Sequence, residues 1–387
     1  MKARVPFLLG LYYFALFAAA GIYVPYLGIY SRGLGFTSLQ VGLLAALTPL
    51  SKILFPPVWG ALADRSGHRR SFILLTTALS IAAFSALFKA ETFLPVAFAL
   101  LAYSFFHAPI LALSETLTLE EAARGGFAYG RVRAWGSVGY MLATLVLGAL
   151  LDLTSMRTFV IAFVAASSLQ LASALALPAG SAPAARHAAR GVWDQLRRSD
   201  VLLFLLACTL MEVSHSAYIG FFGIHLSESG VSKKAIGVML ALPQFSEIPA
   251  MYFADRWLQR AGGRRLMLLA FAAAALRWLV LGITTDLVVV ALSQGLHALT
   301  YGVFHITAVQ MARRLFPAHL QASAQSLYIG LTYGLGGTLG LIAAGRLYDP
   351  LGAQVLFLLS AAVAIAALPA ILRLNDSRAI HPQPESA

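Results

Sequence analysis

Apolar runs of about 20 residues, each bounded by charged or turn-forming residues, recur along the whole chain and constrain its fold more than any other feature. A helix needs about 20 consecutive apolar residues to cross the hydrocarbon core of a bilayer. The pattern predicts twelve such helices and leaves no stretch long enough for a sizeable soluble domain. Their expected limits are 6–30, 39–62, 71–88, 93–114, 134–152, 157–177, 201–226, 234–253, 266–284, 287–311, 323–345 and 353–372.

The composition excludes several other classes of protein. Of the 387 residues, 59% are apolar and only 11% are charged, whereas roughly 25% are charged in a soluble domain. A net charge of +12 would suggest a nucleic-acid partner in a soluble protein, but here the basic residues lie between the apolar runs. Cys208 is the only cysteine, which excludes a disulfide within the chain, a zinc knuckle and a CxxC site. We therefore expect an all-α integral membrane protein with no cofactor, no metal and no nucleic-acid partner.

The distribution of Lys and Arg predicts the orientation in the membrane. The two termini and the loops on their side of the predicted spans hold 20 basic residues, and the opposite loops hold 6. Basic residues collect on the cytoplasmic side of membrane proteins. We therefore expect both termini to be cytoplasmic in a multi-pass, monomeric protein of a bacterial inner membrane.

The two halves of the chain repeat at an offset of 195 residues. Tyr23, Gly28, Ile29, Gly35 and Gly42 match Tyr218, Gly223, Ile224, Gly230 and Gly237, and Gly148 and Asp152 recur as Gly345 and Asp349. Two parallel six-helix repeats are typical of transporters that bind their solute between the halves at the midplane. The predicted domains are a six-helix bundle over 1–178, a cytoplasmic linker over 179–200, a second six-helix bundle over 201–373 and a cytoplasmic tail over 374–387.

Two loops, one in each half, carry related charged motifs. Their residues are Gly60, Asp64, Arg65, Gly67, Arg69 and Arg70 after the second predicted span, and Asp255 and Arg256, followed by another Arg pair, after the eighth. Both loops resemble the cytoplasmic loop signature of the major facilitator superfamily. The resemblance implies that superfamily's fold of two pseudo-symmetric six-helix bundles and a cytoplasmic gate, in which the Asp accepts from a neighbouring helix N-terminus and Arg. The alternative is that these charges only fix topology and a tight turn.

A narrower resemblance lies in residues 127–140, FAYGRVRAWGSVGY. This segment is similar to the start of the fifth span in the lactose permease group. The resemblance implies that Glu115 and Arg133 bind substrate as a pair and that Tyr140 stacks on it.

The resemblance extends into the second half. Glu247, Arg277 and His297 fall where the lactose permease group carries residues for coupling, but Thr300 stands where that group has a proton-carrying Glu one turn after its His. Phenylpropionate permeases also lack that Glu. They resemble this chain at Lys52, His215, Glu247, Arg277, His297 and His305.

Ionisable residues inside the predicted spans are the candidates for function, because each costs at least about 2.5–3.5 kcal/mol at a helix centre. Lys52 precedes Glu247 by the repeat offset, so we expect the two to face each other, with Lys52 available to a substrate carboxylate. The alternative is a static ion pair.

Glu247 is the favoured proton carrier, tuned by Arg277 and His297, because burial and nearby cations move the pKa of a carboxyl in opposite directions. Glu212 with His215 is the second candidate pair. His107 and Tyr218 complete the predicted substrate-binding residues. For His107 and His305, an interhelical hydrogen bond is the alternative role.

These features predict a proton-coupled symporter for a small organic solute, namely an aromatic monocarboxylate, or alternatively a sugar or nucleoside. Drug:proton antiport is the less favoured alternative, because no Pro lies between Trp135 and Asp152, where those exporters carry a Gly-Pro-rich signature. The chain also has no G-x-x-x-x-G-K-[ST], H-E-x-x-H or G-x-S-x-G motif, so we do not expect a pump or an enzyme.

Overall fold

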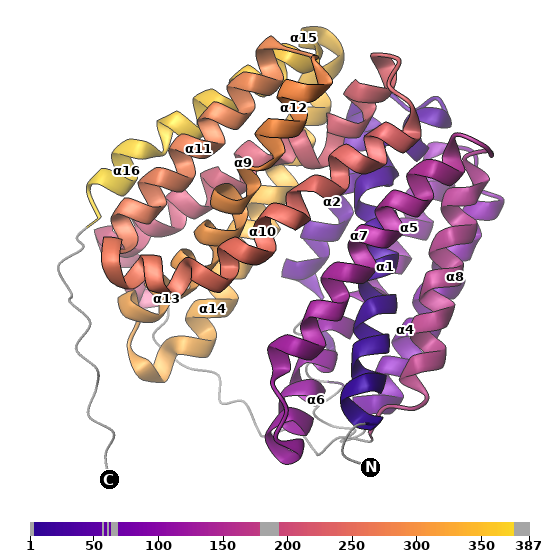
Figure 1. The fold of residues 1–387 in the computed structure, drawn as a ribbon, viewed down its shortest axis with the longest axis horizontal. Coiled ribbons are helices and arrows are strands. Elements are labelled where there is room, and N and C mark those ends of the chain that lie inside the picture. Colours follow the sequence, from indigo (N-terminus) through magenta and orange to yellow (C-terminus); the bar gives the residue numbers. More distant parts are fainter. Residues whose placement is uncertain (1–3, 56–57, 60–61, 63–68, 179–192, 375–387) are drawn as a thin grey trace. The chain divides into compact units, whose positions relative to one another are not determined.

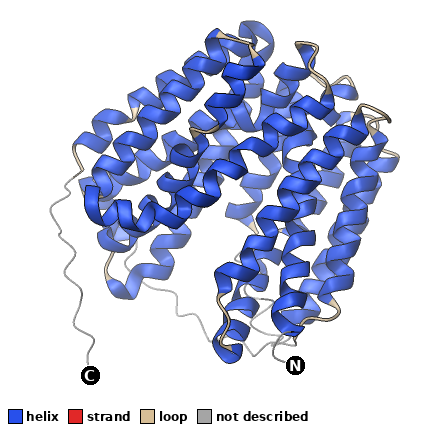
Figure 2. Ribbon diagram, in the orientation of Figure 1, coloured by secondary structure: helices blue, strands red, loops and turns tan. Residues whose placement is uncertain are grey.

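The computed structural model describes residues 4–55, 58–59, 62, 69–178 and 193–374, and every regular element in this part is helical (Figure 2). The elements are α1 (Arg4–Gly33), α2 (Ser38–Leu54), α4 (Arg69–Ser85), η1 (Ala86–Phe88), α5 (Phe93–His107), α6 (Ile110–Gly125), α7 (Tyr129–Leu151), α8 (Arg157–Ala174), η2 (Trp193–Arg197), α9 (Ser199–Glu228), α10 (Lys233–Ala261), α11 (Gly263–Ile283), α12 (Leu287–Gln294), η3 (Ala298–Val303), α13 (Phe304–Leu315), η4 (Ala318–Leu320), α14 (Gln321–Ile329), η5 (Gly330–Gly336), α15 (Gly337–Ala366) and α16 (Leu368–Leu372).

Helices lie at all twelve predicted places. Among the described residues, nine helices are long and apolar enough to cross a membrane, and the last of them extends over 323–372. Gly352 breaks this stretch with a φ of +79°, between the eleventh and twelfth predicted spans. α2 and α10 occupy the places of the second and eighth predicted spans.

Large apolar side chains are exposed along these helices. The exposed fraction is 68% for Phe7, 68% for Phe98 and 70% for Ile283. In water, so much exposed apolar surface would make the protein associate with other copies, whereas lipid chains solvate it. The helices therefore present the surface expected of membrane spans.

The contacts between helices define two compact units. Unit 1 comprises residues 1–186, 216–242 and 337–356, and unit 2 comprises 187–215, 243–336 and 357–387. Three long helices, α9, α10 and α15, therefore contribute one end to each unit.

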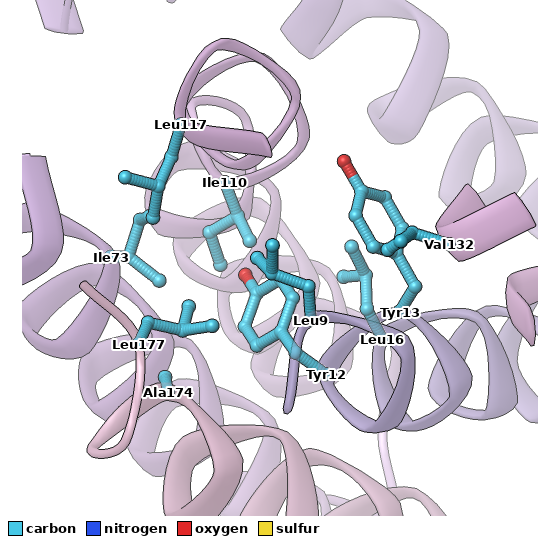
Figure 3. Packing of buried hydrophobic residues seen from close by; sticks show 10 residues of the cluster. All are labelled: Leu9, Tyr12, Tyr13, Leu16, Ile73, Ile110, Leu117, Val132, Ala174 and Leu177. Carbon is cyan, nitrogen blue, oxygen red and sulfur yellow. The ribbon is translucent and has the colours of Figure 1, made fainter. Parts of the chain in front are cut away.

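Within unit 1, α1 packs along α7 and α8, and α4 packs along α5 and α8 (Figure 1). Glycines allow the close approach of α1 to α7. A Cβ atom on Gly139 would lie 2.1 Å from the carbonyl oxygen of Phe14, and one on Gly21 would lie 2.3 Å from that of Tyr140. Beside this contact, Tyr12 and its apolar neighbours from five helices form a buried core (Figure 3).

Within unit 2, α11 packs against α12, η3, α13 and α16. This central position explains why Arg277 and Trp278 in α11 are fully buried. Two segments of the unit, η3 and η5, are π-helical. Short π-helical turns are rare and occur frequently at functional sites, so η3 and η5 direct attention to the side chains around them.

Candidate functional site

A buried polar cluster in unit 2 joins three residues that the sequence predicts for proton coupling. The Nε2 atom of His297 lies 3.4 Å from a carboxylate oxygen of Glu247 on α10. The other ring nitrogen, Nδ1, lies 3.1 Å from a guanidinium nitrogen of Arg277 on α11. Glu247 and His297 are each 9% exposed and Arg277 is 0% exposed. The structure therefore places an acid, an imidazole and a permanent cation in one chain of contacts.

Gln294, which the sequence reasoning missed, completes this cluster. Its side-chain oxygen accepts a hydrogen bond of 2.6 Å from Arg277, and its amide nitrogen donates to the carbonyl of Val290 at 3.0 Å. The side chain is fully buried. The sequence did contain a signal that Gln294 belongs to the cluster: it lies three residues before His297, and residues three apart share one face of a helix.

The π-helical segment η3 places three rings in a ladder. His297 stacks on Tyr301 with a centroid distance of 5.2 Å and an interplanar angle of 10°, and Tyr301 stacks on His305 at 6.1 Å and 8°. In an α-helix of 3.6 residues per turn, positions four apart drift around the axis. The small interplanar angles show that the three rings lie nearly parallel along this side of η3 and the start of α13.

His305 continues the cluster to the second π-helical segment. Its Nδ1 atom lies 2.9 Å from the hydroxyl of Tyr333 in η5, and that hydroxyl lies 3.3 Å from the hydroxyl of Tyr328 on α14. The interhelical hydrogen bond considered for His305 is therefore present.

His215 and Glu212, the second pair predicted for proton coupling, contact different parts of unit 2. The Nδ1 atom of His215 donates to the carbonyl of Met211 at 2.9 Å, and its Nε2 atom lies 3.4 Å from the Thr300 hydroxyl. The ring packs edge-on against Trp278. Glu212 lies against η5, where its Cβ atom would be 3.5 Å from a Cβ atom on Gly336. The side chain of Glu212 is also within electrostatic range of Tyr328 and Tyr333.

The predicted substrate residues of unit 1 include Glu115 and Arg133, which form no ion pair with each other among the described residues. Tyr129 donates to Glu115 at 3.3 Å. The Arg133 guanidinium lies over the ring of Phe17 at 3.8 Å and near that of Tyr13 at 5.7 Å. Among the described residues, no acidic side chain forms an ion pair with Arg133.

The other predicted substrate residues lie on several helices of unit 1. His107 stacks on Tyr103 at 5.0 Å, and Lys52 lies within electrostatic range of His107. Tyr218 stacks on Phe222 at 4.6 Å. Tyr140 lies on α7, where its backbone packs against Gly21.

Part of the predicted cytoplasmic gate lies outside the described residues, namely Gly60, Asp64, Arg65, Gly67 and the side chain of Asp255. Of the rest, Arg69 pairs with Glu120 on α6, and Arg70 donates to the carbonyl of Leu175. Arg256 lies 5.9 Å over the ring of Phe253.

A second polar cluster lies in unit 1, at the ends of α1, α2 and α9 and beside the break of α15 at Gly352. Asp349 accepts from the backbone N–H and the hydroxyl of Ser38, and Arg32 bridges Asp349 and Glu228 at 3.0 Å each. Tyr348 donates to Glu228 at 2.8 Å. Arg32, Glu228, Tyr348 and Asp349 line a cavity of about 380 Å³. The sequence reasoning noted Asp349 in a repeated motif but missed its partners.

The repeated motif of the first half makes the equivalent contact. Asp152 accepts from the backbone N–H groups of Lys233 and Lys234 at 2.7 and 2.9 Å. One turn away, Gly148 approaches Gly237, and Gly345 approaches Gly42 in the same way. A Cβ atom added to Gly148 or to Gly345 would lie 3.0 Å from the Cα atom of the facing glycine. Both glycine–aspartate repeats therefore hold the start of a helix of the other half.

Comparisons with known proteins agree with this architecture. Residues 7–359 match the model of the MFS_1 like family. The chain is 32% identical over 361 residues to a maltose permease of Geobacillus stearothermophilus, covering 90% of this chain and 89% of that protein. It is 26% identical over 375 residues to a probable 3-phenylpropionic acid transporter of Escherichia coli (strain K12), covering 94% and 95%. The crystal structure of the nucleoside transporter NupG superposes with a TM-score of 0.86 at 19% identity, covering 96% and 98%.

Proposed function

Because this chain belongs to the MFS_1 like family, and is therefore a secondary transporter and not an enzyme, we propose that it imports a small organic solute together with protons. The favoured solute is an aromatic monocarboxylate of the phenylpropionate type. In this proposal the bundles 1–178 and 201–373 rock against each other in a bacterial inner membrane, as a monomer with both termini cytoplasmic. The loops around Asp64 and Asp255 gate the cytoplasmic side, and Lys52 and Glu247 face each other across the path of the solute.

The observation that carries the proton coupling is the contact chain from Glu247 through His297 to Arg277. A buried carboxyl group holds a proton more tightly, and a nearby cation promotes its release. Since one imidazole separates Glu247 from Arg277, a small movement of His297 changes how strongly the cation acts on the carboxyl. Glu247 is thus suited to take up and release one proton per transport cycle.

The observation that favours an acid as solute is the position of Arg133. Its guanidinium rests on the face of Phe17, and in the described part of the chain it has no acidic partner. Guanidinium groups bind carboxylates through two parallel hydrogen bonds. The aromatic side chains Tyr13 and Phe17 supply a surface for a planar ring beside it.

A sugar or nucleoside is the second candidate, because relatives include a maltose permease and the superposed structure is a nucleoside transporter. Hydroxyl-rich solutes need both donors and acceptors, and the Glu115–Tyr129 pair offers them. Drug:proton antiport is the least favoured, since no observation in either unit supports it.

Transport by purified protein in liposomes with an imposed pH gradient tests the proposal. The solutes compared are 3-phenylpropionate, maltose and a nucleoside. We expect accumulation of 3-phenylpropionate that disappears when the gradient is collapsed. In Glu247→Gln, accumulation should be lost while exchange of labelled for unlabelled solute continues. Accumulation of maltose or the nucleoside alone would favour the second candidate, and full accumulation by Glu247→Gln would refute its role as proton carrier.

A further inference from the structure

Tyr129, the first residue of α7, contacts one member of the predicted substrate pair and shares a helical face with the other. Its hydroxyl donates to the Glu115 carboxylate on α6 at 3.3 Å. Arg133 follows Tyr129 by four residues on α7, so the two side chains leave the same face of the helix, about 6 Å apart along its axis. A carboxylate held by Tyr129 is therefore within reach of a side chain as long as that of Arg133.

The guanidinium of Arg133 is directed toward α1 instead. Its central carbon lies 3.8 Å from the centroid of Phe17, a ring that stacks on Tyr13 with an interplanar angle of 18°. Gly136 makes room for this arrangement, because a Cβ atom there would lie 2.9 Å from a guanidinium nitrogen of Arg133 and 2.7 Å from the Phe17 ring. Attraction to the ring face holds a cation without using its N–H groups. In the described part of the chain, those N–H groups of Arg133 make no hydrogen bond.

The carboxylate of Glu115 and the carboxylate of an acidic solute compete for this one guanidinium. Arginine binds a carboxylate through two parallel hydrogen bonds, so a direct pair of Glu115 with Arg133 would occupy the donors that the solute needs. The Tyr129 hydroxyl offers Glu115 a different donor. A hydrogen bond to a charged group is strong enough to shift such a competition by about tenfold or more.

We propose that Tyr129 determines specificity at the solute site: by donating to Glu115 it holds this carboxylate away from Arg133, so that Arg133 is available to an acidic solute. This rests on the proposed function, in which Arg133 binds the solute carboxylate. Tyr129 is a positioning residue, because it acts on the solute through Glu115 and Arg133. Without its hydroxyl, Glu115 pairs with Arg133 and the site loses its preference for an anion.

Binding to the purified full chain in detergent tests the proposal, with 3-phenylpropionate as the acid and 3-phenylpropanol as its uncharged counterpart. We expect Tyr129→Phe to weaken binding of the acid about tenfold and to change binding of the alcohol little. Adding Glu115→Gln to Tyr129→Phe should restore acid binding to the level of Glu115→Gln alone, because a neutral amide does not neutralise Arg133. Tyr30→Phe is the matched control, since it removes a hydroxyl at the other end of α1, and it should bind both compounds like the wild type.

The infrared carboxylate stretch of Glu115, assigned by its loss in Glu115→Gln, reports the partner of Glu115 without any solute. In the wild-type background, Arg133→Gln should leave this band in place. In Tyr129→Phe, the same change should move it, because Glu115 has then paired with Arg133. The phenylalanine keeps the ring of Tyr129, so a lost side chain does not explain the difference.

The outcomes separate the role of Tyr129 from the proposed function. That role is overturned if Arg133→Gln leaves the band in place in Tyr129→Phe, if Glu115→Gln does not restore acid binding, or if Tyr129→Phe weakens the acid and the alcohol equally. If the wild-type protein binds no 3-phenylpropionate while the band responds as expected, the proposed solute is wrong and the positioning of Glu115 by Tyr129 is supported.

Discussion

The carboxylate of Asp349 caps helix α2 by accepting from both the backbone N–H of Ser38, at 3.0 Å, and its hydroxyl, at 2.6 Å. The first N–H groups of a helix have no partner within the helix and carry partial positive charge, so an acceptor there is stabilising. Asp152 provides the same cap for α10. The two aspartates belong to one repeated motif, so the repeat in the sequence has a structural consequence: an aspartate of each half caps a helix of the other half.

Removing the two caps should destabilise the protein by different amounts. Asp152→Ala loses a cap, which costs about 1 kcal/mol. Asp349→Ala loses a cap and also leaves Arg32 with Glu228 as its one remaining ion-pair partner among the described residues, so its loss of stability should be larger. Thermal unfolding in detergent measures both variants against the wild type. A smaller shift in Asp349→Ala than in Asp152→Ala would contradict this order.

The glycine pair beside the Asp349 cap should tolerate no side chain. A Cβ atom on Gly42 would lie 2.5 Å from the carbonyl oxygen of Leu341, so Gly42→Ala forces α2 and α15 apart. We expect a lower unfolding temperature and faster labelling of a cysteine introduced at Ser38. Gly130→Ala is the matched control, because nothing lies within 4 Å of its Cβ position. It should be neutral or stabilise by up to about 1 kcal/mol through helix propensity.

The fold was predictable from the sequence because membrane spans depend on local composition. Twelve apolar runs predict twelve helices, and the family match and the NupG superposition confirm the superfamily fold. The break at Gly352 falls between two of these runs. The two units defined by contacts differ from the predicted halves, because α9, α10 and α15 each pack at one end with unit 1 and at the other with unit 2.

The candidate site was predictable only for residues that are recognisable from the sequence without knowing their neighbours in space. Glu247, Arg277 and His297 stand out as ionisable residues in apolar runs, and the structure brings all three together. Gln294 carries no charge, so its role depends on the position of Arg277. The π-helical turns have no sequence signature that we recognised, and Tyr333 lies within reach of His305 through its place in η5.

Gln294 should hold Arg277 in place by its side-chain oxygen alone. Gln294→Leu removes the acceptor of a 2.6 Å hydrogen bond from the Arg277 guanidinium, and a hydrogen bond to a charged group contributes about 1.5–3 kcal/mol. Gln294→Glu keeps an oxygen at the same place. We therefore expect Gln294→Leu to unfold at a lower temperature than Gln294→Glu in the same detergent. The prediction is wrong if the two variants unfold together.

Arg133 should bind an acidic solute by its shape as well as its charge. The guanidinium carbon lies 3.8 Å from the centroid of the Phe17 ring. A planar guanidinium can bind a carboxylate through two parallel hydrogen bonds. Lysine keeps the charge but is a compact ammonium that cannot make that paired contact. A charged hydrogen bond contributes about 1.5–3 kcal/mol, or roughly ten- to a hundredfold in affinity. Arg133→Lys should therefore weaken binding of 3-phenylpropionate by this factor, and Arg133→Gln should weaken it at least as much.

Phe17→Leu removes the ring beneath the guanidinium and should have a smaller effect in the same direction. Binding of the uncharged 3-phenylpropanol serves as the control, since it lacks the carboxylate and should change little between wild type and variants. Equal losses for the acid and the alcohol would show that Arg133 supports the packing of α1 on α7 and does not recognise a carboxylate.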